Sequence, residues 1–341
     1  MVRRCVIEKK RKPDEPGSFF RKGLKGLFIL PLAAAGSWIL YSHLGIDHHV
    51  PLPKALPGEH KFFTSPGAGK LSYYTQRGGA GRPVVFIHSI NAAASAYEMR
   101  PLYLHFQQQR PVYALELPGF GFSERSRRVY SPGVYIQAIR DFLSTQVGEP
   151  ADVVALSLAS EFAASAALAE PEQFASLVLI SPSGFGKGQE ERGSQQASQN
   201  GLSRVIHPLF SFPVWARPFF DLLATRQSIE YFLKQSFIGA VPPDLVEYDY
   251  AAAHQPGAEH APLYFISGQL FTPDIRRKVY EQIRVPSLVL YDRDNFVGFD
   301  KLPETLANNK FVHAVRLIPT LGLPHFEQPE ETCARLAEFW E

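Results

Sequence analysis

Cysteine is scarce in this chain, with two residues among 341. Cys5 and Cys333 stand at opposite ends of the sequence, one in a basic tail and the other in a predicted helix. A disulfide framework and a cysteine-based zinc site both need several cysteines at characteristic spacings. The sequence therefore gives no indication of either.

A basic surface is also missing from most of the chain. Residues 1–25 carry nine Lys and Arg against three Asp and Glu. Of the 35 basic and 33 acidic residues in the whole chain, 26 and 30 lie in the remainder, whose net charge is −4. Nucleic-acid binding relies on clustered Lys and Arg, so nucleic acid is not an expected partner. With 45% hydrophobic and 20% charged residues the composition is that of a globular protein.

Charge is absent from Gly26 to Ile46, where 21 residues contain no Asp, Glu, Lys or Arg. A helix of this length, rising about 1.5 Å per residue, would just cross the roughly 30 Å hydrocarbon core of a bilayer. The stretch therefore predicts a membrane-anchor helix over 26–46. The preceding Lys and Arg place the N-terminus in the cytoplasm and the rest of the chain on the opposite side. The alternatives are a cleaved signal peptide, which implies secretion, and an ordinary helix.

The remaining chain reads as a proline-rich linker over residues 47–61 and a folded body over 62–341. In the body, short apolar segments alternate with segments of helical periodicity. Continuous apolar segments of this length are typical of buried parallel strands, and their alternation with helices predicts a doubly wound, mostly parallel sheet. The strand-like segments after the first lie at 83–88, 111–117, 152–156, 176–181, 287–292 and 314–319.

A serine interrupts the passage from a strand to a helix in ADVVALSLASEFAASAAL, residues 151–168. The apolar run 153–156 stops at Ser157, and an Ala-rich helical pattern follows at once. Two interpretations explain a hydroxyl here: a nucleophile raised on a sharp turn, or the N-cap of the following helix. The local sequence leaves both open.

Four segments of residues 60–341 resemble, in the same order, those of the α/β-hydrolase superfamily. VVFIHSINAAASAYEMRPL resembles the His-Gly oxyanion loop after the third strand, and ALELPGFGFSERS the Asp-x-Pro-Gly-x-Gly-x-Ser loop. VVALSLAS resembles the nucleophile elbow, and LPHFEQPEE the histidine loop before the last helix. The resemblance implies an α/β-hydrolase fold with a helical cap inserted at about residues 183–282.

The elbow departs from the family's G-x-S-x-G pattern, because alanines stand at positions 155 and 159. Alanine is the smallest residue with a Cβ, so the tight turn can still close. The resemblance implies that Ser157 is the nucleophile and that the backbone N–H groups of Leu158 and Ile90 form the oxyanion hole. The related haloalkane dehalogenases and epoxide hydrolases need a carboxylate at this position, and none is present.

The other two residues of a Ser-His-Asp triad match the family's pattern less directly. Two acids, Asp292 and Asp294, follow the penultimate strand-like segment; we expect Asp294 to be the triad acid, with Asp292 as the alternative. The family's G-H-x-P-x-x-E-x-P becomes LGLPHFEQP here, which puts Gly322 at the family's histidine position. His325, three residues later, is the expected base, since His313 falls in the last strand.

The sequence thus predicts a membrane-anchored serine hydrolase that cleaves an ester or other acyl bond of a small molecule with an apolar portion. The mechanism requires no metal and no organic cofactor. One alternative is a catalytically inactive α/β-hydrolase-like binding or scaffold protein; another is a lyase or peroxidase with the same triad. The apolar substrate is indicated by the aromatic residues of the cap, namely Phe210, Phe212, Trp215, Phe219, Phe220, Tyr231, Phe232 and Phe237.

Overall fold

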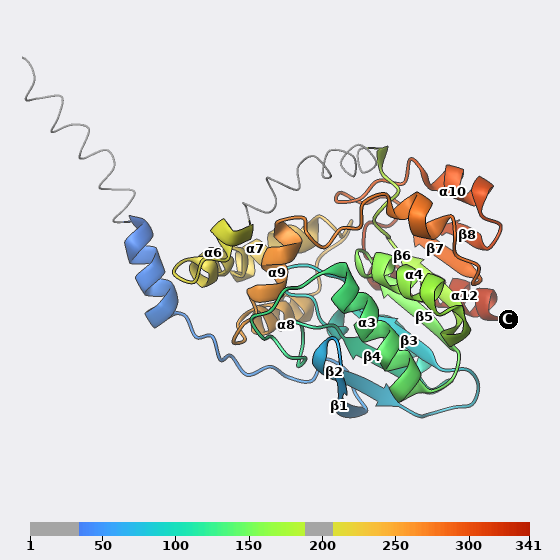
Figure 1. The fold of residues 1–341 in the computed structure, drawn as a ribbon, viewed down its shortest axis with the longest axis horizontal. Helices are drawn as coiled ribbons and strands as arrows, with labels where there is room; N and C mark the ends of the chain where they lie inside the picture. The colour runs from blue at the N-terminus through green and yellow to red at the C-terminus, as the bar shows by residue number, and fades with distance from the viewer. Residues whose placement is uncertain (1–33, 188–206) are drawn as a thin grey trace, which may run out of the picture. The chain divides into compact units, whose positions relative to one another are not determined.

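An eight-stranded sheet forms the centre of residues 47–341 in the computed structural model, which describes residues 34–187 and 207–341 (Figure 1). The strand order is β1-β2-β4-β3-β5-β6-β7-β8. β2 pairs antiparallel with β1 and β4, and the other pairs are parallel, so the predicted mostly parallel sheet is confirmed. The strands are β1 (Glu59–Ser65), β2 (Gly69–Gln76), β3 (Val84–Ile87), β4 (Val112–Glu116), β5 (Ala151–Leu156), β6 (Phe174–Ile180), β7 (Ser287–Tyr291) and β8 (Val312–Arg316).

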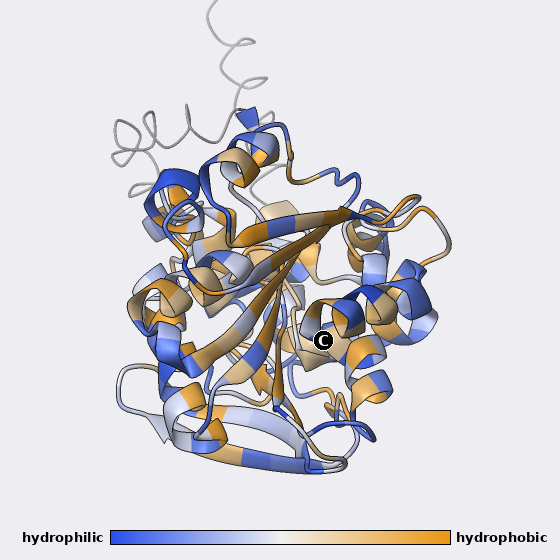
Figure 2. Ribbon diagram, turned by 90° about the vertical axis from the view of Figure 1, so that its right-hand side faces the viewer, coloured by the Kyte–Doolittle hydropathy of each residue, from blue (hydrophilic) through white to orange (hydrophobic). Residues whose placement is uncertain are grey.

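Helices cover both faces of the sheet, which explains why its central strands are apolar without alternation (Figure 2). Successive strand residues point to opposite faces, so Val85 and Phe86 of β3 belong to different core clusters. Val85 shares its cluster with α3 (Pro132–Phe142), α4 (Ala159–Ala169) and α10 (Leu302–Asn308). Phe86 shares its cluster with α2 (Arg100–Phe106) and α12 (Pro329–Trp340).

A long insertion between β6 and β7 carries further helices, in the place where a cap is predicted. Its helix α8 packs against η1 (Ala96–Met99), the short helix that follows β3, and Tyr97 and Tyr248 stack with ring centroids 4.7 Å apart. The insertion therefore lies beside the carboxyl end of β3. Its described elements are α6 (Ala216–Leu223), α7 (Arg226–Lys234), α8 (Pro243–Ala253), α9 (His260–Ile266) and η4 (Arg276–Tyr280).

The proline-rich segment before β1 lies against this insertion. Ala55 and Leu56 are buried, and the Pro53 carbonyl accepts a hydrogen bond from the Tyr248 hydroxyl at 3.1 Å. Residues 59–61 of the predicted linker already belong to β1. Proline restricts the backbone of this segment, and the contacts with α8 fix its position on the insertion.

The predicted membrane-anchor helix is contradicted. Residues 1–46 form a separate unit, whose described helix at 34–45 is about 18 Å long at 1.5 Å per residue. Within 34–187 and 207–341, no helix has the length and apolar character needed to cross a bilayer. The basic tail 1–25 and the first part of the predicted span, 26–33, lie outside the described residues. Lack of charge was the main signal for the anchor, and the prediction of a single-pass membrane protein is wrong.

Candidate active site

The residues that the sequence singles out follow the carboxyl ends of the parallel strands. Ser89 follows β3, Ser157 follows β5, and Asp294 follows β7. Ile87 pairs with Ala155, so Ser89 and Ser157 each stand two residues beyond the same point of the β3–β5 ladder. In open α/β sheets this edge is where ligands bind.

Ser157 sits on a strained turn between β5 and α4. Its φ of +53° lies in the left-handed region, which costs a residue with a Cβ about 1–2 kcal/mol. The turn is held by the Ser157 N–H, which donates to the Ile180 carbonyl of β6 at 2.8 Å. The N-cap position of α4 is Leu158, and no side chain caps it, so the interpretation of Ser157 as an N-cap is not supported.

In the loop after β3, the Glu98 carboxylate engages Ser89 and the Asn91 side chain but not the Ile90 N–H. The Ser89 N–H donates to the Glu98 carboxylate at 2.8 Å, and the Ser89 hydroxyl and Asn91 Nδ2 donate to it at 2.9 and 2.7 Å. The N–H groups of Ile90 and Leu158, the two predicted oxyanion donors, make no hydrogen bond to other described residues. Asn91 is thus engaged by Glu98, which leaves Ile90 as the candidate donor from this loop.

Two buried carboxyl groups that the sequence analysis missed lie between this loop and the insertion. Glu98 and Asp249 of α8 are each 3% exposed. Burial raises the pKa of Glu98 to about 7, and burial together with the Glu98 charge raises the pKa of Asp249 well above its usual value. Asp249 Oδ1 has no hydrogen-bond partner in the described part of the chain. No spacing pattern distinguishes such buried acids from surface acids of the same helices.

A third buried acid, Glu161 of α4, joins the nucleophile helix to the insertion. Its carboxylate accepts hydrogen bonds from the Ser183 hydroxyl and from the Thr272 N–H, the latter at 2.8 Å. Burial raises its pKa to about 7. Ser183 and Thr272 stand near the two ends of the insertion, so Glu161 fastens both to the helix that begins after Ser157.

His325 lies in α11 (Pro324–Glu327) and is fully buried. Its Nε2 is 2.7 Å from the carbonyl oxygen of Glu98. A carbonyl only accepts, so Nε2 carries the proton and Nδ1 holds the lone pair. Nδ1 has no hydrogen-bond partner among residues 34–187 and 207–341, and burial lowers the pKa of the imidazole to about 4. No hydrogen bond joins His325 to Ser157 or to Asp294 within these residues.

The two candidate acids after β7 have different surroundings. Asp292 is 4% exposed and accepts hydrogen bonds from Arg316 Nε at 2.8 Å and from the Thr320 N–H at 3.0 Å. Asp294 is partly exposed, and its Oδ1 accepts two backbone N–H groups of its own loop, at 2.7 and 3.3 Å. Partial burial raises the pKa of Asp294 to about 6. Asp292 thus fastens β8 and the following loop, whereas Asp294 has no cation beside it in the described part of the chain.

The free oxygen of Asp294 faces Gly322. A Cβ built on Gly322 would lie 2.8 Å from Asp294 Oδ2 and 3.4 Å from the Cβ of Ser236. The acid therefore meets the chain at the position of the family's histidine, and glycine stands there. Of the predicted triad, the structure brings Asp294 to position 322, and it brings His325 to Glu98.

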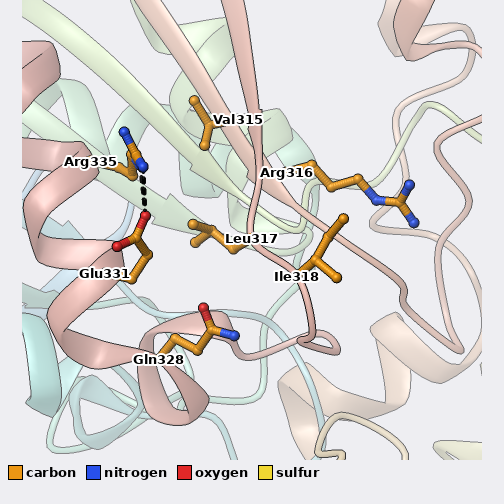
Figure 3. A pocket seen from close by; sticks show the side chains of 7 residues that line it. All are labelled: Val315, Arg316, Leu317, Ile318, Gln328, Glu331 and Arg335. Atoms are coloured by element: carbon orange, nitrogen blue, oxygen red, sulfur yellow. Dashed lines mark hydrogen bonds and ion pairs between the residues drawn. The ribbon is translucent and has the colours of Figure 1, made fainter.

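A surface hollow of about 330 Å³ lies elsewhere, between β8 and α12 (Figure 3). Its walls include Leu317, Ile318 and the ion-paired Glu331 and Arg335. None of the predicted site residues lines it. We therefore place the candidate active site at the strand edge around Ser157.

The strain at Ser157 predicts an unusual order of stabilities. Ser157→Gly is expected to unfold with a free energy about 1 kcal/mol higher than Ser157→Ala, because only alanine keeps a Cβ in the left-handed region. The matched pair is Ser160→Gly and Ser160→Ala, inside α4, where glycine should be the less stable variant by about 0.5–1 kcal/mol. Urea denaturation measures all four. The same order at both positions would refute strain at Ser157.

The burial of Asp249 predicts that the free energy of unfolding falls as the pH rises. The pKa of Asp249 is higher in the folded than in the unfolded state, and below about pH 4 the acid is protonated in both. As the pH rises above this value, the unfolded state releases the proton first, so the free energy of unfolding falls. Asp249→Asn should therefore gain stability relative to the parent chain between pH 4 and pH 8, in urea denaturation at each pH. Asp244→Asn, exposed on the same helix, is the control and should change little. A difference between Asp249→Asn and parent that is constant with pH would contradict the assignment.

Comparison with known proteins places this geometry in a family. A model of the alpha/beta hydrolase family matches residues 84–335. The chain is similar in structure to a probable hydrolytic enzyme from Pseudomonas aeruginosa, with a TM-score of 0.67 and 16% identity over 86% of this chain and 98% of that one. It is also similar to a membrane phospholipase A, a bacterial virulence factor (TM-score 0.61, 18% identity, 94% and 98%). A thermophilic esterase from Thermogutta terrifontis has a TM-score of 0.60 and 17% identity over 83% and 98%.

No curated protein sequence matches the chain. At 16–18% identity the structural likenesses establish the fold alone. The family model covers well over half of the sequence, from β3 to α12, and includes every residue discussed for the site. The chain therefore belongs to the alpha/beta hydrolase family.

Proposed function

We propose that this chain is a serine hydrolase that cleaves an ester or other acyl bond, with Ser157 as its nucleophile. The observation that carries the proposal is the left-handed φ of +53° at Ser157, on the turn after β5. Backbone strain of this kind tends to persist where function uses it. The hydroxyl is partly exposed and makes no hydrogen bond to other described residues, so it is available to a substrate.

In the proposed reaction, Ser157 Oγ attacks the acyl carbonyl carbon while its proton passes to a base. The negative charge that develops on the carbonyl oxygen is stabilised by the Leu158 and Ile90 N–H groups and by the N-terminus of α4. The proton then moves to the leaving oxygen, and water releases the acyl group from Ser157 by the same steps. His325 remains the base predicted from the sequence; with Nε2 bonded to Glu98, only its Nδ1 could accept a proton.

The proposed substrate has an apolar portion. Phe220 of the insertion is fully buried and packs with Ala93, in the loop that carries Ile90. Other aromatic residues of the insertion, such as Tyr231 at 62% exposed and Phe232 at 45%, face solvent. Apolar insertion residues thus adjoin the oxyanion loop, and an esterase and a phospholipase A are among the similar structures, which supports an acyl substrate.

One observation favours a second candidate function. Glycine occupies the family's histidine position beside Asp294, as expected of a binding protein that has lost turnover. The two candidates differ in whether Ser157 reacts at all, because a fluorophosphonate requires an activated serine.

Wild-type protein is expected to be labelled by a fluorophosphonate at Ser157, and Ser157→Ala to lose both labelling and ester turnover while it stays folded, since one hydroxyl on a turn contributes little to packing. Peptide mass spectrometry locates the label. His313→Ala, exposed on β8, is the control and should label as wild type does. Labelling that persists in Ser157→Ala would contradict the role of this serine.

Turnover should increase with acyl length along a p-nitrophenyl ester series from acetate to octanoate. Each buried CH₂ group contributes up to about 0.8 kcal/mol, or roughly fourfold in kcat/KM. Initial rates at low substrate concentration measure the effect. A profile that is flat or falls from acetate upward would remove the argument for an apolar pocket.

A further inference from the structure

We infer that the catalytic base of this site is supplied by the ligand, as an imidazole group that binds the Asp294 carboxylate beside Gly322. The inference rests on the proposed function, because a base is needed only if Ser157 attacks an acyl group. It assigns to the ligand a specific chemistry: one nitrogen that accepts a proton and a second that donates an N–H to Asp294.

Asp294 lacks the cationic partner that three other aspartates of the described residues have. Asp152 pairs with Arg110, Asp221 with Arg217, and Asp292 with Arg316. Asp294 has no ion pair with a described Lys, Arg or His, and its Oδ2 accepts no hydrogen bond from these residues. A partly desolvated carboxylate gains most from a charge-assisted N–H donor, and partial exposure lets a ligand reach this one.

Asp294 faces a residue that has no side chain to act as a base. Oδ2 points at the backbone of Gly322, the position where the family's pattern has its histidine. Glycine has no side chain that could donate to the carboxylate or accept the serine proton. The acid of a triad is thus in place opposite a residue that cannot be its base.

His325 is poorly placed to act as the base instead. The ring is fully buried, and its Nε2–H is committed to the Glu98 carbonyl. A general base is most effective when its pKa is near the working pH, and burial lowers the pKa of His325 to about 4. The contacts of His325 are those of a residue that fastens α11 to η1.

Every proton that moves in the inferred reaction has a donor and an acceptor. One imidazole nitrogen of the ligand takes the proton of Ser157 Oγ as this oxygen bonds to the acyl carbon, and the other N–H donates to Asp294 Oδ2. The new imidazolium returns the proton to the leaving oxygen as its bond to the acyl carbon breaks. Water then attacks the acyl-serine, loses its proton to the same nitrogen, and the proton returns to Ser157 Oγ.

The test uses free imidazole as the probe and the rate of fluorophosphonate labelling of Ser157 as the readout. Without imidazole, the wild-type chain should label and turn over esters only at the residual rate that the oxyanion amides support. Imidazole should accelerate labelling more than about tenfold at saturation, a conservative share of the 10²–10⁴ typical of acid–base catalysis. The control ligand is 1-methylimidazole, which is a similar base but has no N–H for Asp294, and it should accelerate labelling far less. Asp294→Asn should lose the difference between the two ligands.

A covalent version of the test places the imidazole in the chain. Gly322→His should label more than about tenfold faster than Gly322→Ala without added imidazole, since both variants add the same Cβ beside Asp294 but only one adds a base. If Gly322→His does not fold, as judged by circular dichroism, the imidazole titration of the wild-type chain decides alone. His325→Gln should keep its response to imidazole; a response confined to this variant would identify His325 as the base and overturn the inference.

A binding measurement separates this inference from the proposed function. Saturation-transfer NMR should detect imidazole on Ser157→Ala and lose it on Ser157→Ala with Asp294→Asn. Rapid wild-type labelling that ignores imidazole, with Gly322→His no faster than Gly322→Ala, would overturn the inference and leave Ser157 as nucleophile. Folded protein that binds imidazole through Asp294 but never labels would instead refute the proposed function and leave a binding site.

Discussion

The hydrogen bond from the Ser157 N–H to the Ile180 carbonyl is the constraint on which the site depends. It extends the β5–β6 ladder by one residue beyond Leu156 and so forces the chain to leave the sheet abruptly. Ser157 takes up the strain with a left-handed backbone, and α4 begins two residues later. The cost of about 1–2 kcal/mol is tolerated because β5 is paired on both sides and buried along its whole length. A mobile strand end would relax, and the serine would lose its fixed position.

Glu98 organises the other half of the site around that turn. Its carboxylate holds both the backbone and the side chain of Ser89, together with Asn91, while its carbonyl holds His325. One residue of η1 thereby connects the loop after β3 to the loop after β8. Asp249 of the insertion lies close enough for the two charges to interact, so the protonation of this pair is linked to the packing of α8. The arrangement is polar and buried, and the hydrogen bond to the Glu98 carbonyl holds His325 within it.

In the proposed site, the serine, the oxyanion amides and the acid are Ser157, the Leu158 and Ile90 N–H groups, and Asp294, all of which follow carboxyl ends of strands. His325, the base predicted from the sequence, is instead buried against the Glu98 carbonyl. Among residues 34–187 and 207–341, Asp294 has no cation beside it and faces Gly322. The inferred consequence is a partly desolvated carboxylate that an N–H donor from a ligand can reach.

Much of the fold could be predicted from the sequence, because a short apolar segment bounded by turn residues indicates a buried strand. The strands β3 to β8, the position of the insertion and the turn at Ser157 follow from local pattern and from order along the chain. The prediction of a membrane anchor was wrong because the absence of charge over 26–46 says nothing about how long a helix forms there. The choice of Asp294 over Asp292 came from spacing and stays a prediction; in the structure Asp292 is engaged by Arg316 and Thr320.

Only the tertiary structure decided which side chains meet. Three residues separate Gly322 from His325, and the sequence allows either to approach Asp294 within a bent loop. The hydrogen bond to Glu98, 227 residues away in sequence, draws His325 into the core and leaves Gly322 beside the acid. Glu98 and Asp249 likewise became part of the site through packing between η1 and α8. The sequence by itself determined that a mostly parallel sheet forms, the order of its strands and helices along the chain, and the turn at Ser157, because these depend on local burial and turn chemistry. The partners of buried polar groups depend on contacts between distant segments, which no local pattern contains.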